Sequence, residues 1–145
     1  MAIDKSGQWW KASDPSDIQP YLVAFTAGSY PIAAFRPAVC ICGSLAFHVD
    51  ADDNEGTARR TCTRCSHIHF IGDSAEYWAG AEPERCACPC GEESMNVGVG
   101  FALYPDDHEV QWLYIGCRCT RCGVLGCYAD WKVAYSPSLH LLAQA

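Results

Sequence analysis

Four short cysteine motifs constrain this chain more than any other feature of its 145 residues. Two of them hold cysteines one residue apart and end in glycine, and they are Cys40-Ile41-Cys42-Gly43 and Cys88-Pro89-Cys90-Gly91. The other two are identical Cys-Thr-Arg-Cys segments at 62–65 and 119–122. Each half of the chain contains one motif of each kind in the same order, which indicates an internal duplication.

The segments between the paired motifs also match. Phe47 stands six residues before Asp53, and Phe101 stands six residues before Asp107. A pair of aspartates, at 52–53 and at 106–107, thus falls midway between the cysteine motifs of each half. Short polar side chains favour turns because they bond to the local backbone. Each half is therefore predicted to form a β-hairpin with its turn at the acidic pair.

Alternating apolar residues support the strands of these hairpins. In the second half they occur at 97, 99, 101 and 103 and again at 110, 112 and 114, which is the period of strands with one buried face. The alternation is weaker in the first half, at Phe47 and Val49 and then at Ile68 and Phe70, so shorter strands are expected there. A third strand is predicted in each half, at 76–78 and at 130–131.

The segments outside the hairpins complete the predicted architecture. Ser16 and Gln19 form a capping box with Pro20 in the first turn, so we expect a short helix that ends at Gly28. Gly80 and Pro83 separate the two halves. The sequence predicts a mainly β fold with a short N-terminal helix (α+β). Its four parts are a helical segment at 1–37, metal-binding units at 38–80 and 84–135, and a tail at 136–145.

The cysteine motifs have the spacing of metal ligands. Four thiolates hold zinc at the corners of a tetrahedron, about 2.3 Å from the ion, and two cysteines on one tight turn supply one edge of it. Glycine after the second cysteine lets the chain turn back. We therefore predict two sites, one formed by Cys40, Cys42, Cys62 and Cys65 and the other by Cys88, Cys90, Cys119 and Cys122.

In these respects each half resembles a zinc ribbon, a hairpin module in which two cysteine-bearing turns, or knuckles, hold one ion, as in rubredoxin-like modules. The resemblance covers residues 38–78 and 86–133 and departs from the usual pattern in the Cys-x-Cys spacing of each first knuckle. It implies two tandem zinc ribbons with two structural zinc ions per chain. Iron also suits four cysteines and is the alternative metal.

Three of the eleven cysteines lie outside these motifs. Cys86 and Cys117 each precede a motif cysteine by two residues, so they face each other across neighbouring strands in the predicted fold. We interpret them as buried thiols. The alternatives are a disulfide between them or a different set of metal ligands that both would join. Cys127 is predicted to lie on a strand in the core. A thiol redox or metal-handling role would depend on these three residues.

Charge bears on the choice of partner. The formal net charge is −7, and two four-thiolate zinc sites bring it to about −11, which disfavours binding to phosphate backbones. Six arginines nevertheless flank the knuckles, at 59, 60, 64, 85, 118 and 121. We interpret them as compensation for thiolate charge. The alternative is a basic face that binds single-stranded nucleic acid, with Trp78 or Trp112 stacking on the bases.

The sequence contains no pattern typical of an enzyme active site. Four cysteines close a zinc site to water, whereas catalytic zinc keeps one position open. His67 and His69 are expected to face solvent because the cysteine sets are complete without them. The most apolar stretch, at 21–35, is too short to span a membrane. We therefore expect a cytoplasmic, non-enzymatic adaptor that binds an unidentified protein partner, with Trp9-Trp10 as a further candidate contact.

Overall fold

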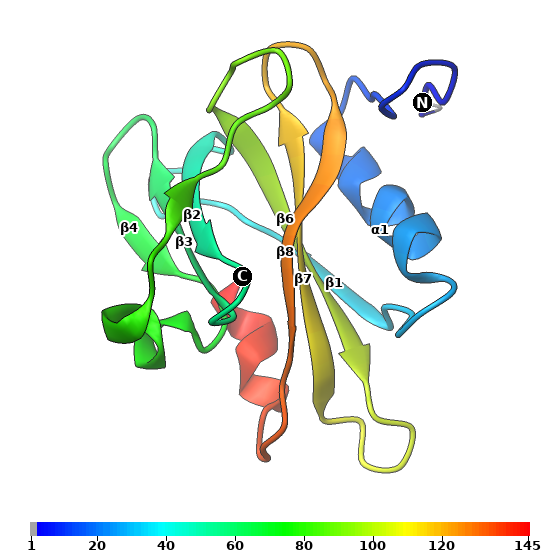
Figure 1. Cartoon of the computed structure of the whole chain (residues 1–145), viewed down its shortest axis with the longest axis vertical. Helices are drawn as coiled ribbons and strands as arrows, with labels where there is room; N and C mark the ends of the chain where they lie inside the picture. The colour runs from blue at the N-terminus through cyan, green and yellow to red at the C-terminus, as the bar shows by residue number, and fades with distance from the viewer. Residues whose placement is uncertain (1–2) are drawn as a thin grey trace.

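The computed structural model describes residues 3–145 and is mainly β, with one short α-helix near the N-terminus, as predicted (Figure 1). The α-helix is α1 (Ile18–Thr26). Four 3-10 helices are η1 (Pro15–Asp17), η2 (Ser74–Glu76), η3 (Trp78–Gly80) and η4 (Leu139–Gln144). The strands are β1 (Ala34–Pro37), β2 (Phe47–Asp52), β3 (Thr57–Cys62), β4 (Ile68–Phe70), β5 (Glu84–Arg85), β6 (Met95–Leu103), β7 (Val110–Cys119) and β8 (Leu125–Lys132).

Both predicted hairpins form, and both turn at the acidic pairs. β2 pairs with β3 around the turn at 53–56, and β6 pairs with β7 around the turn at 104–109. The Asp52 carboxylate accepts hydrogen bonds from the backbone N–H groups of Asn54 and Glu55, at 3.0 and 3.2 Å. Asp107 accepts one from Glu109 at 3.0 Å. The aspartates thus stabilise the turns by the local bonding that their side chains favour.

The third strand differs between the halves. Asp130 and Trp131 lie in β8, as predicted, but residues 76–78 form parts of η2 and η3, and the third strand of the first half is β4. The prediction for 76–78 is therefore wrong. Ser74 explains the change, because its hydroxyl accepts the backbone N–H of Ala58 at 2.8 Å in place of a strand partner. The chain leaves the sheet at that point.

The N-terminal helix begins differently from the capping-box prediction. Asp14 caps the preceding turn η1, and its carboxylate accepts the backbone N–H of Ser16 at 2.8 Å. The α-helix ends at Thr26, whose hydroxyl donates to the carbonyl of Leu22 at 2.8 Å. The helix packs closely on β7, because Gly116 has no Cβ to meet the side chain of Ile18. Figure 1 shows α1 beside the long strands β6, β7 and β8.

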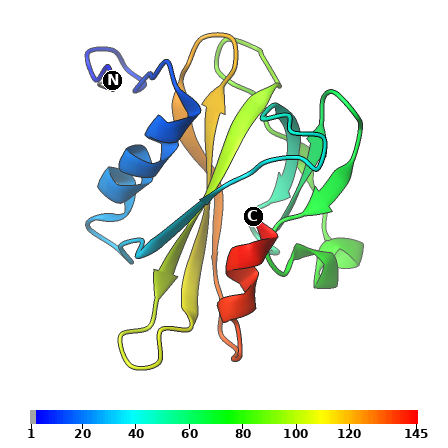
Figure 2. The ribbon, with the colours of Figure 1, turned by 180° about the vertical axis from the view of Figure 1, so that it is seen from behind.

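One sheet runs through both halves in the order β4-β3-β2-β6-β7-β8. The halves join where Phe47 of β2 pairs with Met95 of β6. β1 pairs with β6 over residues 98–101 and runs across the side that faces the viewer in Figure 2, while β5 pairs with β2. The strand order places the two predicted metal-binding units next to each other.

The core is shared between the halves. The larger cluster of buried side chains draws on β2 and β3 as well as β6 and β7, and η4 adds Leu141, which is 2% exposed. A second cluster lies under α1 and contains Ile18 and Leu22 from the helix with Tyr114 and Leu125 from the sheet. The loops that carry the cysteine motifs lie toward the upper end of the molecule in Figure 1.

Candidate metal centres

The first four predicted ligands come together at the ends of strands. Cys40 and Cys42 lie on the turn between β1 and β2, while Cys62 ends β3 and Cys65 follows it. The sulfur atoms of Cys40 and Cys65 are 3.4 Å apart, and those of Cys42 and Cys62 are 3.7 Å apart. All four sulfur atoms lie within 4.8 Å of one another. We call this group the first cluster.

The second group repeats the arrangement. Cys88 and Cys90 precede β6, Cys119 ends β7, and Cys122 lies on the turn into β8. The sulfur atoms of Cys88 and Cys122 are 3.4 Å apart and those of Cys90 and Cys119 are 3.7 Å apart, which matches the first group. Again all four lie within 4.8 Å of one another. This group is the second cluster.

The donor set fits a tetrahedral metal ion. Zinc–sulfur bonds of about 2.3 Å place neighbouring sulfurs about 3.8 Å apart in a tetrahedron. The observed separations of 3.4 and 3.7 Å are close to that edge. The backbone N–H groups of Arg64 and Cys65 point at the Cys62 sulfur, at 3.3 and 3.4 Å, as they do around a thiolate. Both clusters can therefore hold a metal ion through thiolates.

Glycines allow three of the four knuckle turns. Gly43, Gly91 and Gly123 have φ values of +90°, +94° and +81°, which only glycine adopts without steric cost. The backbone N–H groups of Gly43 and Gly91 each donate to the carbonyl of the first knuckle cysteine, at 2.8 Å. In the remaining knuckle Ser66 takes this position with φ +66°. The same backbone turn thus presents the sulfurs in both halves.

Backbone hydrogen bonds also change the acidity of the ligands. The N–H of Cys65 lowers the pKa of the Cys62 thiol to about 6, and the N–H of Glu92 lowers the pKa of Cys90 to about 7. A lower pKa favours the thiolate, which is the form that binds metal.

The other three cysteines lie outside both clusters. All eleven cysteines are free of disulfides, so the disulfide alternative for Cys86 and Cys117 is not realised. Neither residue belongs to a ligand group within residues 3–145. Burial raises the pKa of Cys86 to about 11, that of Cys127 to about 12 and that of Cys117 well above its usual value. Protonated thiols are weak nucleophiles, which disfavours the redox alternative.

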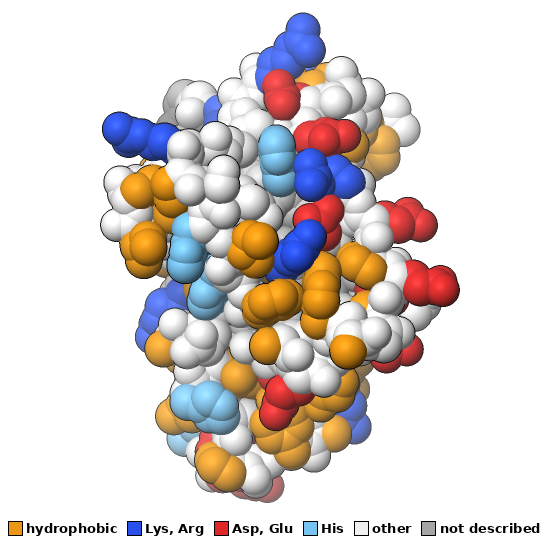
Figure 3. All heavy atoms as spheres, turned by 90° about the vertical axis from the view of Figure 1, so that its left-hand side faces the viewer, with side chains coloured by type: hydrophobic (Ala, Val, Ile, Leu, Met, Phe, Trp, Pro, Cys, Tyr) orange, Lys and Arg blue, Asp and Glu red, His pale blue; other side chains and the backbone are white. Residues whose placement is uncertain are grey.

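The knuckle arginines are spread over several environments. Arg59 and Arg85 both bind the Asp50 carboxylate, at 3.4 and 2.8 Å. Arg118 donates to the carbonyl of Ala12 and to the side chain of Asn96. On the side of the molecule shown in Figure 3, acidic, basic and hydrophobic side chains are interspersed. Arg59, Arg85 and Arg118 are thus each bonded to other groups of the chain.

Arg60 alone is buried, at 6% exposure. Its guanidinium lies over the Phe47 ring, 4.7 Å from the centroid, and donates to the carbonyl of Ala145 at 2.8 and 3.2 Å. Burial lowers the pKa of Arg60, whereas the nearby Cys40 and Cys62 raise it. This arginine matches the expected compensation of thiolate charge at the first cluster.

The histidines and tryptophans take no part in the clusters. His67 is exposed, as expected, but His69 is half-buried and its ring nitrogen lies 3.1 Å from the Gln144 carbonyl. Trp9 is 47% exposed. Trp10 instead packs edge-on against Tyr21, with a centroid distance of 5.9 Å.

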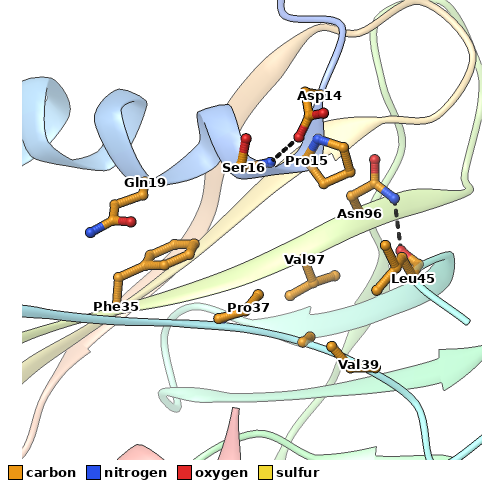
Figure 4. A pocket seen from close by; sticks show the side chains of 11 residues that line it. Asp14, Pro15, Ser16, Gln19, Phe35, Pro37, Val39, Leu45, Asn96 and Val97 are labelled. Atoms are coloured by element: carbon orange, nitrogen blue, oxygen red, sulfur yellow. Dashed lines mark hydrogen bonds between the residues drawn. The ribbon is translucent and has the colours of Figure 1, made fainter. Parts of the chain in front are cut away.

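An apolar cavity lies beside the first cluster and was not foreseen from the sequence. It has a volume of about 540 Å³. Its floor is formed by β1, the segment after it and β6, while the start of α1 lies across from it (Figure 4). Val39 and Leu45 line it and are 49% and 43% exposed. Ile41, on the adjoining knuckle, is 84% exposed. Together Val39, Ile41 and Leu45 form what we call the knuckle face.

No helix within residues 3–145 has the length and apolarity needed to cross a membrane.

The fold and the clusters define a mainly β protein with two duplicated four-cysteine groups that can hold metal ions. Comparison of the chain with models of protein families, with curated proteins and with solved structures gave no match in any of the three.

Proposed function

We propose that the chain binds two zinc ions as structural elements and acts as a non-enzymatic adaptor, docking a partner protein on the knuckle face. The observation that carries this proposal is Ile41, which is 84% exposed between two cluster cysteines. Large exposed apolar side chains grouped around a cavity are typical of interaction surfaces. A metal-bound turn would hold such a side chain in a fixed position, so little conformational entropy would be lost when the partner binds.

Zinc is supported by the donor set. Four thiolates complete a tetrahedral coordination shell, which is typical of structural zinc and leaves no position for a reacting water. Cys40, Cys42, Cys62 and Cys65 would hold one ion and Cys88, Cys90, Cys119 and Cys122 the other. Elemental analysis of purified protein tests this: about two zinc ions per chain are expected. A coloured protein that contains iron would contradict it.

Photo-crosslinking tests the docking face. A benzoylphenylalanine at position 41 is expected to crosslink the partner in the native host, and the same residue at position 139 serves as a control. Leu139 is a suitable control site because it is 46% exposed and lies on η4. The Ile41→Asp variant should no longer bind the partner but should still bind both metal ions. A partner that crosslinks equally at both positions, or that Ile41→Asp still binds, would refute the proposed docking face.

One contact favours a second candidate function, the binding of single-stranded nucleic acid. Arg59 lies over the ring of Trp78, 4.9 Å from its centroid, on the exposed side of β3. An arginine and an aromatic ring side by side can stack on bases. However, Asp50 already binds both Arg59 and Arg85, so less positive charge is left for phosphates. We therefore rank this function below the adaptor role.

A further inference from the structure

We infer that the cavity beside the knuckle face is the specificity pocket of the adaptor, and that it receives a partner segment in which bulky apolar residues are flanked by lysine or arginine. This inference rests on the proposed docking function and names the chemistry of the partner. It is carried by the shape and lining of the cavity and by the charge at its rim.

The lining explains the apolar part of the partner segment. Phe35, Pro37 and Val39 come from successive alternate positions of one extended segment, so their side chains lie on the same face (Figure 4). Val97 and Leu45 complete the apolar surface. A volume of about 540 Å³ is within the range of sites that bury small ligands, and it has room for more than one bulky side chain.

The rim explains the preference for basic residues. Asp14 lies at the edge of the cavity and is fully exposed, and the N–H and hydroxyl groups of Ser16 lower the pKa of its carboxyl. It therefore carries a negative charge at neutral pH. The other polar residues that line the cavity, Ser16, Gln19 and Asn96, are uncharged. Arg118 does not line the cavity, but it donates to Asn96 and offsets part of the charge of Asp14, whose pKa it also lowers. With a net charge of −7 the whole chain adds to the attraction for a basic segment.

Asn96 contributes to the cavity as a positioning residue. Its amide nitrogen donates to the carbonyl of Leu45 at 2.7 Å, and its amide oxygen accepts from Arg118 at 2.9 Å. These bonds tie the loop that follows the first knuckle to β6. The cavity wall is thus fixed to the sheet and to the metal-bearing turn at the same time.

Synthetic peptides test the inference without knowledge of the partner. The probe is a fluorescein-labelled pentapeptide that alternates lysine and leucine, measured by fluorescence anisotropy on the zinc-loaded full chain. Two further peptides replace the lysines with glutamates or the leucines with serines. We expect the lysine–leucine peptide to bind more tightly than either of them. Equal affinity for all three peptides would overturn the inference.

Two variants with matched controls locate the binding. Gln19→Trp fills the cavity from an exposed position of α1 and should lower the affinity for the lysine–leucine peptide about tenfold. This loss corresponds to one apolar side chain of the peptide that can no longer be buried in the cavity. Val23→Trp, on the same helix and 52% exposed, does not line the cavity and should have no effect. An equal loss in both variants would contradict the assignment.

Asp14→Asn keeps a good helix cap but removes the charge. It should reduce the preference for lysine over glutamate peptides by up to about fivefold, whereas Asp107→Asn, which leaves a similar turn, should not. An unchanged preference in Asp14→Asn would refute the role of the rim. If Ile41→Asp no longer binds the partner while Gln19→Trp and Asp14→Asn still bind it, the pocket inference fails and the proposed docking function stands.

Discussion

At the scale of single residues, each knuckle pairs a buried cysteine with a more exposed one. Cys40, Cys62, Cys88 and Cys119 are at most 4% exposed, whereas their knuckle partners reach the surface or lie half-buried. The buried sulfur is held by the core and the other by the turn. A metal ion bound to both would link the core to the surface loops.

Loss of one exposed ligand should therefore empty one site and spare the other. We expect Cys42→Ser to bind about one zinc ion per chain instead of two, because three thiolates do not complete the tetrahedron. Elemental analysis after gel filtration measures this. Cys127→Ser is the matched control, since Cys127 lies outside both clusters and should leave the metal content unchanged. A full zinc content in Cys42→Ser would contradict the ligand assignment.

Loss of the Arg60 side chain should weaken zinc binding at the first cluster only. Its Nε and Nη2 atoms donate to Ala145, but its Nη1 atom is buried and has no hydrogen-bond partner among the described residues. Thiolates at Cys40 and Cys62 would stabilise its positive charge. We expect Arg60→Met to release one of the two zinc ions about tenfold faster to a chelator. Arg59→Met, which changes the exposed side of the same strand, should release both ions at the normal rate.

Acid should release the metal. Zinc binding requires deprotonated thiols, and the lowered pKa values of Cys62 and Cys90, about 6 and about 7, set the range in which protons begin to compete for these two sulfurs. In the same clusters the pKa of Cys65 is raised to about 12, and those of Cys88 and Cys119 are also raised, so protons compete for these sulfurs already at neutral pH. Affinity should therefore decline throughout the fall from pH 8 to pH 5, and more steeply once the pH passes 7 and then 6. A chromogenic chelator followed from pH 8 to pH 5 measures this. Release that does not depend on pH would speak against thiolate ligands.

At the scale of elements, the knuckle turns differ in how tightly they are packed. Gly91 and Gly123 both have positive φ, but the space around Gly91 is open, whereas a Cβ on Gly123 would overlap the carbonyl oxygen of Ala12. The N-terminal segment therefore lies directly against the second knuckle. It also bonds there, because the N–H of Ala12 donates to the carbonyl of Gly123 at 2.9 Å.

This difference gives a matched pair of variants. Gly91→Ala should cost about 1–2 kcal/mol of unfolding free energy from backbone strain alone. Gly123→Ala should cost more, because the N-terminal segment must also move. Urea unfolding of the zinc-loaded protein measures both. Equal effects would show that the contact between Ala12 and the knuckle contributes nothing.

The hairpins, their acidic turns and the gathering of eight cysteines into two groups were predictable from the sequence because local signals specify them. The start of the helix was not predictable, because Asp14 and Ser16 are both good N-cap residues. Only Pro15, in the first turn, favoured Asp14 over Ser16 as the cap. The third strand of the first half depends on Ser74, which bonds to a distant part of β3. The cavity was beyond prediction because α1, β1 and β6 form it together.

At the scale of the whole molecule, charge favours the adaptor role over the binding of nucleic acid. The chain is acidic, and the arginines that the sequence placed near the knuckles are divided among buried, paired and exposed positions. We expect no retention of the protein on heparin or single-stranded DNA at about 150 mM salt. Retention at this salt concentration that Trp78→Ala abolishes would instead favour the nucleic-acid function.

The pairing of Phe47 with Met95 joins the duplicated halves, and both contribute to one core. Duplication normally yields copies that can drift, be lost or be shuffled independently. Here the two halves share one buried cluster, so removing either half would expose apolar side chains of the other. A substitution at the junction in one half should therefore disturb the packing of the other half as well. The first knuckles lie outside this shared interior and carry different residues, Ile41 and Pro89.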